Sequence, residues 1–262
     1  MIGSGLSTVE HALSVWLPYR RPRNKPTIRL FCFAHAGGSA AIFREWNNLL
    51  PPHIEVCAIQ LPGREARSGE PLRRRMDSIV SELAFVLRPL LDRPFALFGH
   101  SLGAKVAFEA ARLLCAEHFH PAHIFVSGSP APHIDSRTIP LHSLPDSELL
   151  EQLRILGGMP ADLLNTRELL TWFLPVIRAD LEVNETYVFT PGAALSSPMT
   201  AFGGAMDSEV PINALEAWRE YTSGPFRRRI LKGGHFFILE EQSVVTKEIR
   251  QDLELLCNGD RI

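Results

Sequence analysis

The chain has 262 residues, of which 45% are hydrophobic and 21% charged, and its formal net charge is −2. This composition is typical of a globular protein with a sizeable core, and the slight negative charge argues against nucleic-acid binding, which usually needs a basic excess. No apolar run approaches the roughly 20 residues that a membrane-spanning helix requires. We expect a single domain over residues 1–262, with an N-terminal lead-in at 1–26.

Short, β-rich apolar runs alternate with helical patterns along the chain. The expected strands are 28–34, 54–60, 95–99, 123–128, 199–204 and 227–232, and the expected helices lie near 41–50, 76–91, 102–117, 212–222 and 241–256. Near-continuous apolar strands suit a parallel sheet that helices cover on both faces. The alternation predicts an α/β fold with a doubly wound, mostly parallel sheet.

Residues 140–187 break this alternation, because they contain no convincing strand. The stretch SLPDSELLEQLRILGG has an early proline, first-turn acids and a terminal glycine pair, which together indicate a helix. A second helix begins at Asn165, with Glu168 three residues later as in a capping box, and Pro175 is expected to kink or divide it. We interpret the segment as a helical insertion that caps the sheet edge where ligands bind in such folds.

The stretch ALFGHSLGAKVAFEAARLL, residues 96–114, places Ser101 between an apolar strand and a helical pattern. Gly99 and Gly103 flank the serine where the sharp strand-to-helix turn of a nucleophile elbow needs small residues. The N–H of Leu102 then lies in the first turn of the helix, where it can stabilise an oxyanion. The motif alone occurs by chance in many loops, but its place between a strand and a helix favours a nucleophilic serine.

A nucleophilic serine needs a base and an acid, which follow it in the order acid, then histidine, in this type of fold. His235, between the last strand and the last helix, is the candidate base, and His142 lies at the start of the insertion. Asp207, just after an apolar run and a glycine pair, is the candidate acid that holds the imidazole tautomer. Asp180, inside the inserted helix, competes with it, but we expect a structural role for Asp180. Asp135 is a loop residue with no special claim to the role.

The loop FAHAGGSA, residues 33–40, follows the first strand and is expected to supply a second oxyanion donor, the N–H of Ala36. His35 and Gly37 in the same loop are candidate substrate-binding residues. His35 is expected to line the pocket and not to act as the base, because it belongs to the wrong loop for that role. The four cysteines form no C-x-x-C pair and have no histidine cluster beside them. We therefore expect reduced thiols, a cytoplasmic protein and no bound metal.

The chain resembles the stand-alone type II thioesterases of polyketide synthase and nonribosomal peptide synthetase systems in seven segments: FCFAHAGGSAAIFREW, QLPGREAR, GHSLGAKVAFE, SGSPAPH, PVIRAD, AFGGAMDSEVPINALEAW and GGHFFIL. The segments run in order from about residue 28 to 240. The resemblance implies an α/β-hydrolase fold with a helical lid at about 140–187. It also implies hydrolysis of misprimed or stalled acyl groups from the phosphopantetheine arm of carrier proteins, without a cofactor of the enzyme's own.

The same resemblance assigns roles to five residues of this sequence. It implies a nucleophile at Ser101, an acid at Asp207 and a base at His235, and it implies oxyanion donors at the backbones of Ala36 and Leu102. All three side chains that carry the chemistry are therefore present and in the expected order.

Three positions depart from the family pattern, and none of them removes a catalytic group. Leu102 stands where methionine is frequent, Ala34 stands where proline is common, and Ser208 stands where proline is frequent. Arg64, in the family marker PGRE, is expected to have a structural role in its loop.

Other functions remain open on the same residues. A general ester hydrolase or an acyltransferase can use the same triad, because only the second acceptor differs. A non-catalytic module that binds a synthetase is a third hypothesis, which the ordered triad argues against. The arginine runs at 73–75 and 227–229 are interpreted mainly as solvated surface, with a landing patch for an acidic carrier domain as the alternative. We expect a monomer.

Overall fold

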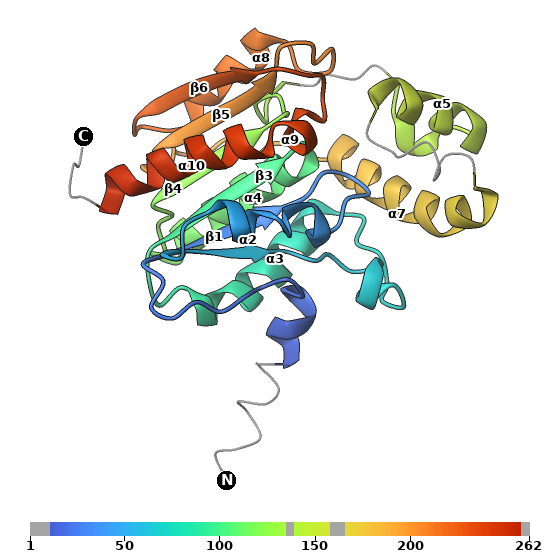
Figure 1. Cartoon of the computed structure of the whole chain (residues 1–262). Coiled ribbons are helices and arrows are strands. Elements are labelled where there is room, and N and C mark those ends of the chain that lie inside the picture. The colour runs from blue at the N-terminus through green and yellow to red at the C-terminus, as the bar shows by residue number, and fades with distance from the viewer. Residues whose placement is uncertain (1–10, 135–138, 158–165, 258–262) are drawn as a thin grey trace.

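The computed structural model describes residues 11–134, 139–157 and 166–257 (Figure 1). Its strands form one parallel sheet in the order β2-β1-β3-β4-β5-β6. Their bounds are β1 (Ile28–Phe33), β2 (Ile54–Ala58), β3 (Phe95–His100), β4 (His123–Ser127), β5 (Met199–Gly204) and β6 (Phe226–Leu231). All six predicted strands are confirmed, with ends that shift by at most two residues.

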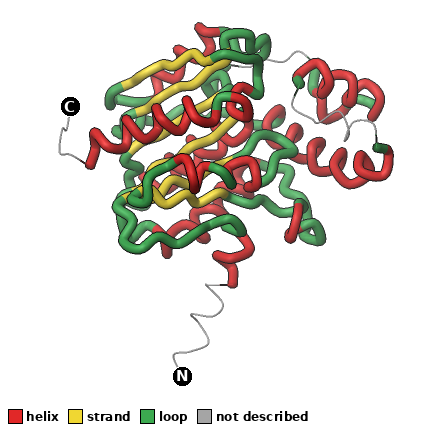
Figure 2. Tube along the Cα trace, viewed as in Figure 1, coloured by secondary structure: helices red, strands yellow, loops and turns green. Residues whose placement is uncertain are grey.

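Helices cover both faces of this sheet (Figure 2). The described helices that follow β1 are α2 (Trp46–Leu49), α3 (Met76–Leu87), α4 (Leu102–Ala116), α5 (Asp146–Leu156), α7 (Arg167–Glu185), α8 (Ile212–Glu216), α9 (Phe237–Glu240) and α10 (Gln242–Cys257). The chain leaves β1 for α2 on one face and leaves β3 for α4 on the other, so the strand order reverses between β1 and β3. The carboxyl ends of two such strands frame the crevice in which α/β proteins bind ligands.

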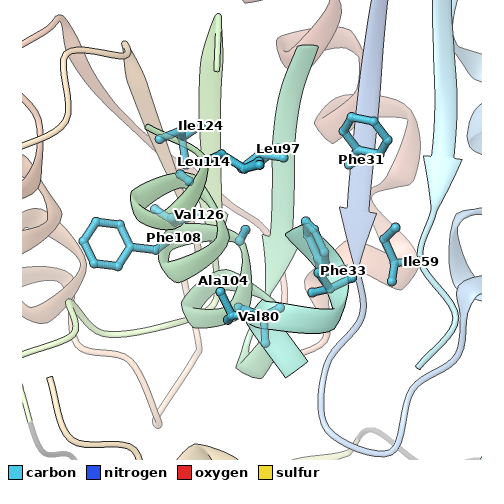
Figure 3. Packing of buried hydrophobic residues seen from close by; sticks show 14 of the residues in the cluster. Phe31, Phe33, Ile59, Val80, Leu97, Ala104, Phe108, Leu114, Ile124 and Val126 are labelled. Atoms are coloured by element: carbon cyan, nitrogen blue, oxygen red, sulfur yellow. The ribbon is translucent and has the colours of Figure 1, made fainter. Parts of the chain in front are cut away.

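The hydrophobic core consists of two layers, one on each face of the sheet. One layer packs α3 and α4 against strand residues such as Phe31, Leu97 and Val126 (Figure 3). The other layer packs α2 and α10 against the opposite side chains of the same strands. Burial of each large apolar side chain contributes about 1.5–3 kcal/mol, so the two layers hold the strand ends in fixed register.

Two predicted helices are interrupted by 3₁₀ turns. The segment expected near 41–50 consists of a 3₁₀ turn (Ala40–Phe43) and the short α2, and the segment near 212–222 consists of α8 and a 3₁₀ turn (Ala217–Tyr221). Side chains three positions apart line up in a 3₁₀ turn. Phe43 and Trp46 are both fully buried, and Trp218 and Tyr221 both pack edge-on against Phe108. The contact of these aromatic side chains with the two core layers accompanies both interruptions.

The segment between β4 and β5 is helical, and its two helices α5 and α7 lie beside the sheet rather than on it (Figure 1). They pack through a separate apolar cluster of Leu141, Leu149, Leu174, Ile177 and Leu181. Pro175 does not divide α7, which runs unbroken from Arg167 to Glu185. The buried residues around the proline offset the hydrogen bond it removes. Asn165, the predicted cap, lies outside the described residues.

The N-terminal lead-in is partly packed. Residues 11–16 are helical, and the side chains of Trp16 and Leu17 are buried in the α3 and α4 layer of the core. The Arg67 guanidinium lies 4.0 Å from the centre of the Trp16 ring, a distance typical of a cation–π contact. Within the described part of the chain, no helix combines the length and the apolar character needed to cross a membrane.

His123, at the start of β4, is a buried histidine in the sheet. Its ring stacks on Phe125 with centroids 4.2 Å apart, and its Nε2 lies 2.9 Å from Thr200 Oγ1, which donates to Asp252. Burial first, and then the charge of Arg227, lower the pKa of His123 to about 3. The unfolded chain begins to protonate this imidazole near its ordinary pKa of about 6.5. At that pH the folded protein still holds the imidazole neutral.

We expect this histidine to make the folded state less stable in mild acid. Between about pH 6 and 4 the unfolded chain binds a proton at this residue and the folded chain does not, so the free energy of unfolding falls by about 1.4 kcal/mol per pH unit as the pH drops. Urea titrations at several pH values measure this slope. In the variant His123→Phe the slope should decrease by that amount, and an unchanged slope would contradict the assignment.

Candidate active site

Ser101 lies at a strained turn between β3 and α4. Its backbone angles are φ 56° and ψ −119°, a region that residues with a side chain rarely adopt. The turn is fixed by the Ser101 N–H, which donates to the carbonyl of Ser127 at 2.7 Å. A side chain in this conformation projects away from the end of the sheet, so the Ser101 hydroxyl is presented at the edge where ligands bind.

The two glycines of the motif are required by close packing of the backbone. A Cβ atom on Gly99 would lie 1.9 Å from the carbonyl oxygen of Gly103. A Cβ atom on Gly103 would lie 2.2 Å from the carbonyl oxygen of Phe33, at the end of β1. Neither neighbour is a flexible side chain that can move away. The glycines therefore bring the start of α4 against the end of β1.

The structure brings Ser101, His235 and Asp207 into one chain of hydrogen bonds. His235 Nε2 lies 3.1 Å from Ser101 Oγ, and His235 Nδ1 lies 3.0 Å from Asp207 Oδ2. The other carboxylate oxygen of Asp207 accepts the N–H of Glu209 at 2.9 Å, and the Asp207 side chain is fully buried. A carboxylate can only accept, so Nδ1 carries the imidazole proton and Nε2 is free to accept the proton of the serine.

Two candidate backbone donors belong to segments that meet at Gly103, two residues after the serine. Leu102 begins α4, and Ala36 lies in the loop after β1, whose last residues pack against Gly103. Among the described hydrogen bonds, the N–H groups of Ala36 and Leu102 have no acceptor within the protein. Such unused donors at a helix start and an adjoining loop are the elements of an oxyanion hole, which keeps both residues as candidates for that role.

The loop residues His35 and Gly37 differ in what they offer a ligand. His35 is buried, its ring packs edge-on against Phe236 at 4.9 Å, and burial, the charge of His235 and that of Arg64 lower the pKa of His35 to about 4. His35 is therefore neutral at physiological pH beside the proposed base. The N–H of Gly37 already donates to Asp180 at 2.7 Å, so it is not available to bind a substrate.

The competing acid and base are engaged elsewhere. Asp180 forms a buried ion pair with Arg64, which agrees with the structural role expected for both residues. His142 Nδ1 lies 2.6 Å from Glu185 within the inserted helices. Asp135 lies outside the described residues. A surface groove of about 660 Å³ between α3, α4 and the segment after α7 contains none of the residues discussed as acid or base.

One residue at the site was not identified from the sequence. His100, directly before Ser101, is fully buried, and its Nδ1 lies 2.9 Å from the Ser127 hydroxyl. Its ring lies against that of His235, with centroids 5.4 Å apart. Burial and the charges of His235 and His35 lower its pKa well below the usual value, so a neutral ring supports His235. The only available signal was its position next to Ser101.

The fold and the site together define a class of protein. A parallel α/β sheet with a serine on a strained strand-to-helix turn, followed along the chain by an acid and a histidine, is the arrangement of the α/β-hydrolases. Residues 28–253 match the family model described as "Thioesterase domain". The chain therefore belongs to the thioesterase domain family and is a thioester hydrolase.

Similar proteins narrow the family further. Linear gramicidin dehydrogenase LgrE of Brevibacillus parabrevis is 40% identical over 95% of this chain and 96% of its own length. Thioesterase PikA5 of Streptomyces venezuelae is 36% identical over 91% of this chain and 85% of its own length. The solved structure of the type II thioesterase BorB from the borrelidin biosynthetic cluster has 37% identity and a TM-score of 0.85, over 91% of this chain and 98% of that chain.

The first of these names denotes a dehydrogenase, whereas the family model and the other two names denote thioesterases. The comparisons confirm the resemblance to the type II thioesterases and the α/β-hydrolase fold.

Proposed function

We propose that this chain is a serine-dependent editing thioesterase, which hydrolyses acyl groups from the phosphopantetheine arm of carrier proteins in polyketide or nonribosomal peptide biosynthesis. The observation that carries the proposal is the unbroken contact from Asp207 through His235 to a serine on a strained turn. The pathway is supported by the names of the relatives, which refer to gramicidin and to the borrelidin cluster.

In the first half of the proposed reaction the serine takes the acyl group. His235 accepts the Ser101 proton at Nε2 while Oγ attacks the thioester carbonyl, and Asp207 stabilises the resulting imidazolium. The N–H groups of Ala36 and Leu102 stabilise the negative oxygen of the tetrahedral intermediate. The C–S bond then breaks, the pantetheine thiolate leaves and takes the proton from His235, and an acyl-enzyme ester forms beside a neutral imidazole.

In the second half water releases the acid. His235 accepts a proton from a water molecule that attacks the ester carbonyl, and the same two N–H groups stabilise the second tetrahedral intermediate. Ser101 leaves with the proton from His235, so the enzyme returns to its starting state. Because the reaction uses only these residues and water, and the pantetheine arm belongs to the carrier protein, we propose no cofactor.

The substrate preference tests this proposal against a general esterase or an acyltransferase. We expect the highest kcat/KM for acyl groups on carrier proteins, a lower value for acyl-CoA with the same acyl group, and the lowest for a simple ester. Product analysis should show the free acid even when an alcohol or amine acceptor is present. A preference for simple esters, or acyl transfer to the added acceptor, would contradict the proposal.

The arginine runs do not form an uncompensated positive patch for the carrier protein. Each arginine pairs with a neighbouring carboxylate, and the pairs are Arg73–Glu82, Arg74–Glu182, Arg75–Asp77, Arg227–Asp252, Arg228–Glu216 and Arg229–Glu248. Exposed pairs of this kind cancel most of the field that would attract an acidic partner. The pairing favours the interpretation of both runs as solvated surface.

A further inference from the structure

The loop after β1, residues 34–39 (the β1 loop), contains a tight turn, and the carbonyl of its first residue, Ala34, lies against Gly103. The N–H of Gly38 donates to the carbonyl of His35 at 2.9 Å, and Gly37 has φ +75°. A positive φ at the third residue of a four-residue turn is the signature of a type II turn. Because the peptide group is planar and trans, holding the carbonyl of His35 also sets the direction of the Ala36 N–H, which points the opposite way.

Two further polar groups of the turn are held from outside the loop. Asp180 Oδ2 accepts the N–H of Gly37 at 2.7 Å, and Arg64 Nη1 donates to the carbonyl of Gly38 at 2.9 Å. Arg64 also binds both carboxylate oxygens of Asp180, at 2.7 and 2.8 Å. Both side chains are buried, so no water competes for these contacts. One fork-to-fork ion pair thus fixes the two glycine peptides that follow Ala36.

A second side chain of helix α7 packs against the same turn. Ile177 lies three residues before Asp180 on α7 and therefore on the same side of the helix. A Cβ atom on Gly37 would lie 2.5 Å from Cγ1 of Ile177, and Ala36 packs against the apolar cluster that Ile177 belongs to. The turn is thus held between the ion pair and an apolar surface, and Ala36 keeps the unused N–H.

We propose that Arg64 and Asp180 are positioning residues that hold the β1 loop in the conformation in which the Ala36 N–H stabilises the oxyanion. They do not touch the reacting atoms and act only through Gly37 and Gly38. The inference rests on the proposed function, because it assumes that the Ala36 N–H is an oxyanion donor. Its consequence is that a substitution on α7, in a part of the chain that brings no group to the reaction, slows the chemical step.

The test compares substitutions at Asp180 on an acyl thioester substrate. Asp180→Ala removes both the acceptor of Gly37 and the partner of Arg64, and we expect kcat to fall about 100-fold with KM within about threefold, near the lower end of what loss of one oxyanion donor costs. Asp180→Asn keeps one acceptor oxygen for Gly37, and we expect a smaller loss of about tenfold. This order is the rescue expected of a positioning role.

A matched control separates positioning from stability. Glu55 pairs with Arg29 in a buried contact between β2 and β1, remote from the serine. Glu55→Gln makes the same chemical change as Asp180→Asn and should lower the melting temperature with kcat unchanged. The double variant Arg64→Met with Asp180→Leu removes both buried charges together, which a folded protein tolerates better than loss of one. It should fold and still show the loss in kcat.

Two further readouts identify the oxyanion as the affected group. An alkyl boronic acid, which forms a negatively charged tetrahedral adduct with a nucleophilic serine, should bind the Asp180 variants more weakly in proportion to kcat. The midpoint of the pH profile of kcat/KM should not move, because the contact between His235 and Asp207 is untouched. Asp180→Ala and the double variant with kcat and boronate affinity within twofold of the wild type would overturn the inference.

Failure of the inference and failure of the proposed function give different results. If the proposed function is wrong because Ser101 is not the nucleophile, the boronic acid does not bind the wild-type protein at Ser101 and Ser101→Ala stays active. If it is wrong in its substrate class, the substrate comparison described above shows a preference for simple esters or acyl transfer. If only the inference is wrong, the wild type binds the boronic acid, Ser101→Ala is inactive and the variants of Asp180 behave like the wild type.

Discussion

Replacement of Ser101 by alanine is expected to lower kcat for thioester hydrolysis at least about 10⁴-fold, because no covalent acyl-enzyme can form without the hydroxyl. The small activity that remains would come from water attack in a site that still has oxyanion donors. Substrate binding should change little, because the substitution of serine by alanine removes only the hydroxyl oxygen. The variant is therefore expected to bind the acyl carrier protein without turning it over.

Mass spectrometry of the enzyme mixed with an excess of substrate tests the covalent step directly. The wild type should carry the acyl group on the peptide that contains Ser101, and Ser101→Ala should carry none. The variant should also unfold at the wild-type temperature, because the strained backbone at φ 56° is imposed by the surrounding packing and not by the hydroxyl. Ser78→Ala, on the exposed side of α3, serves as the control. An acyl adduct in Ser101→Ala would show that another residue is the nucleophile.

The strands β1 to β5 could be predicted because each is buried along its whole length, and continuous apolar runs report that burial directly. The edge strand β6 is only partly buried. Helices α3, α4 and α10 could be predicted because their apolar residues recur with the period of a helix. The single helix predicted around Phe43 and Trp46 was wrong. A spacing of three residues fits one turn of an α-helix as well as a 3₁₀ turn, and only contact with the sheet decides between them. The hydrogen bond that a proline removes from a helix predicts a kink or a break at Pro175, whereas packing on both sides of the proline keeps α7 whole.

Within the site, the chain order of serine, acid and histidine named side chains that lie in hydrogen-bond contact. That success depends on fold topology, since parallel strands deliver their following loops to one edge. The partner of Gly37 could not be named, because Asp180 lies 143 residues away and Arg64 is 116 residues from Asp180. No local periodicity joins residues so far apart. Two motifs with no evident chemistry, PGRE and RAD, turned out to meet each other.

The contact between Asp180 and Gly37 also changes how the inserted helices relate to the site. The same helix α7 supplies the acid of the ion pair, the apolar contact of Ile177 and part of the cluster that Ala36 packs against. The inserted helices therefore contact the β1 loop as well as lying beside the sheet. Their position and the geometry of the β1 loop are coupled, so substitutions that loosen α7 are expected to reach kcat through the loop.

Replacement of Asp207 by asparagine is expected to lower kcat by about 10⁴-fold, because it forces the imidazole into the wrong tautomer. The N–H of Glu209 donates to Asp207 Oδ1, so the asparagine must place its oxygen there and turn its NH₂ group toward His235. That NH₂ group donates to Nδ1, and the imidazole proton moves to Nε2. Nε2 can then only donate toward Ser101, and it cannot accept the proton of the serine.

The tautomer can be observed as well as inferred. In ¹⁵N spectra of the protein, the His235 signal, assigned by its loss in His235→Gln, should show a protonated Nδ1 in the wild type and a protonated Nε2 in Asp207→Asn. Asp77→Asn, an exposed aspartate on α3, should change neither the spectrum nor kcat. If Asp207→Asn retained the Nδ1 proton or lost less than tenfold in kcat, another group would orient His235, since only an acceptor at Nδ1 can leave Nε2 free to activate the serine.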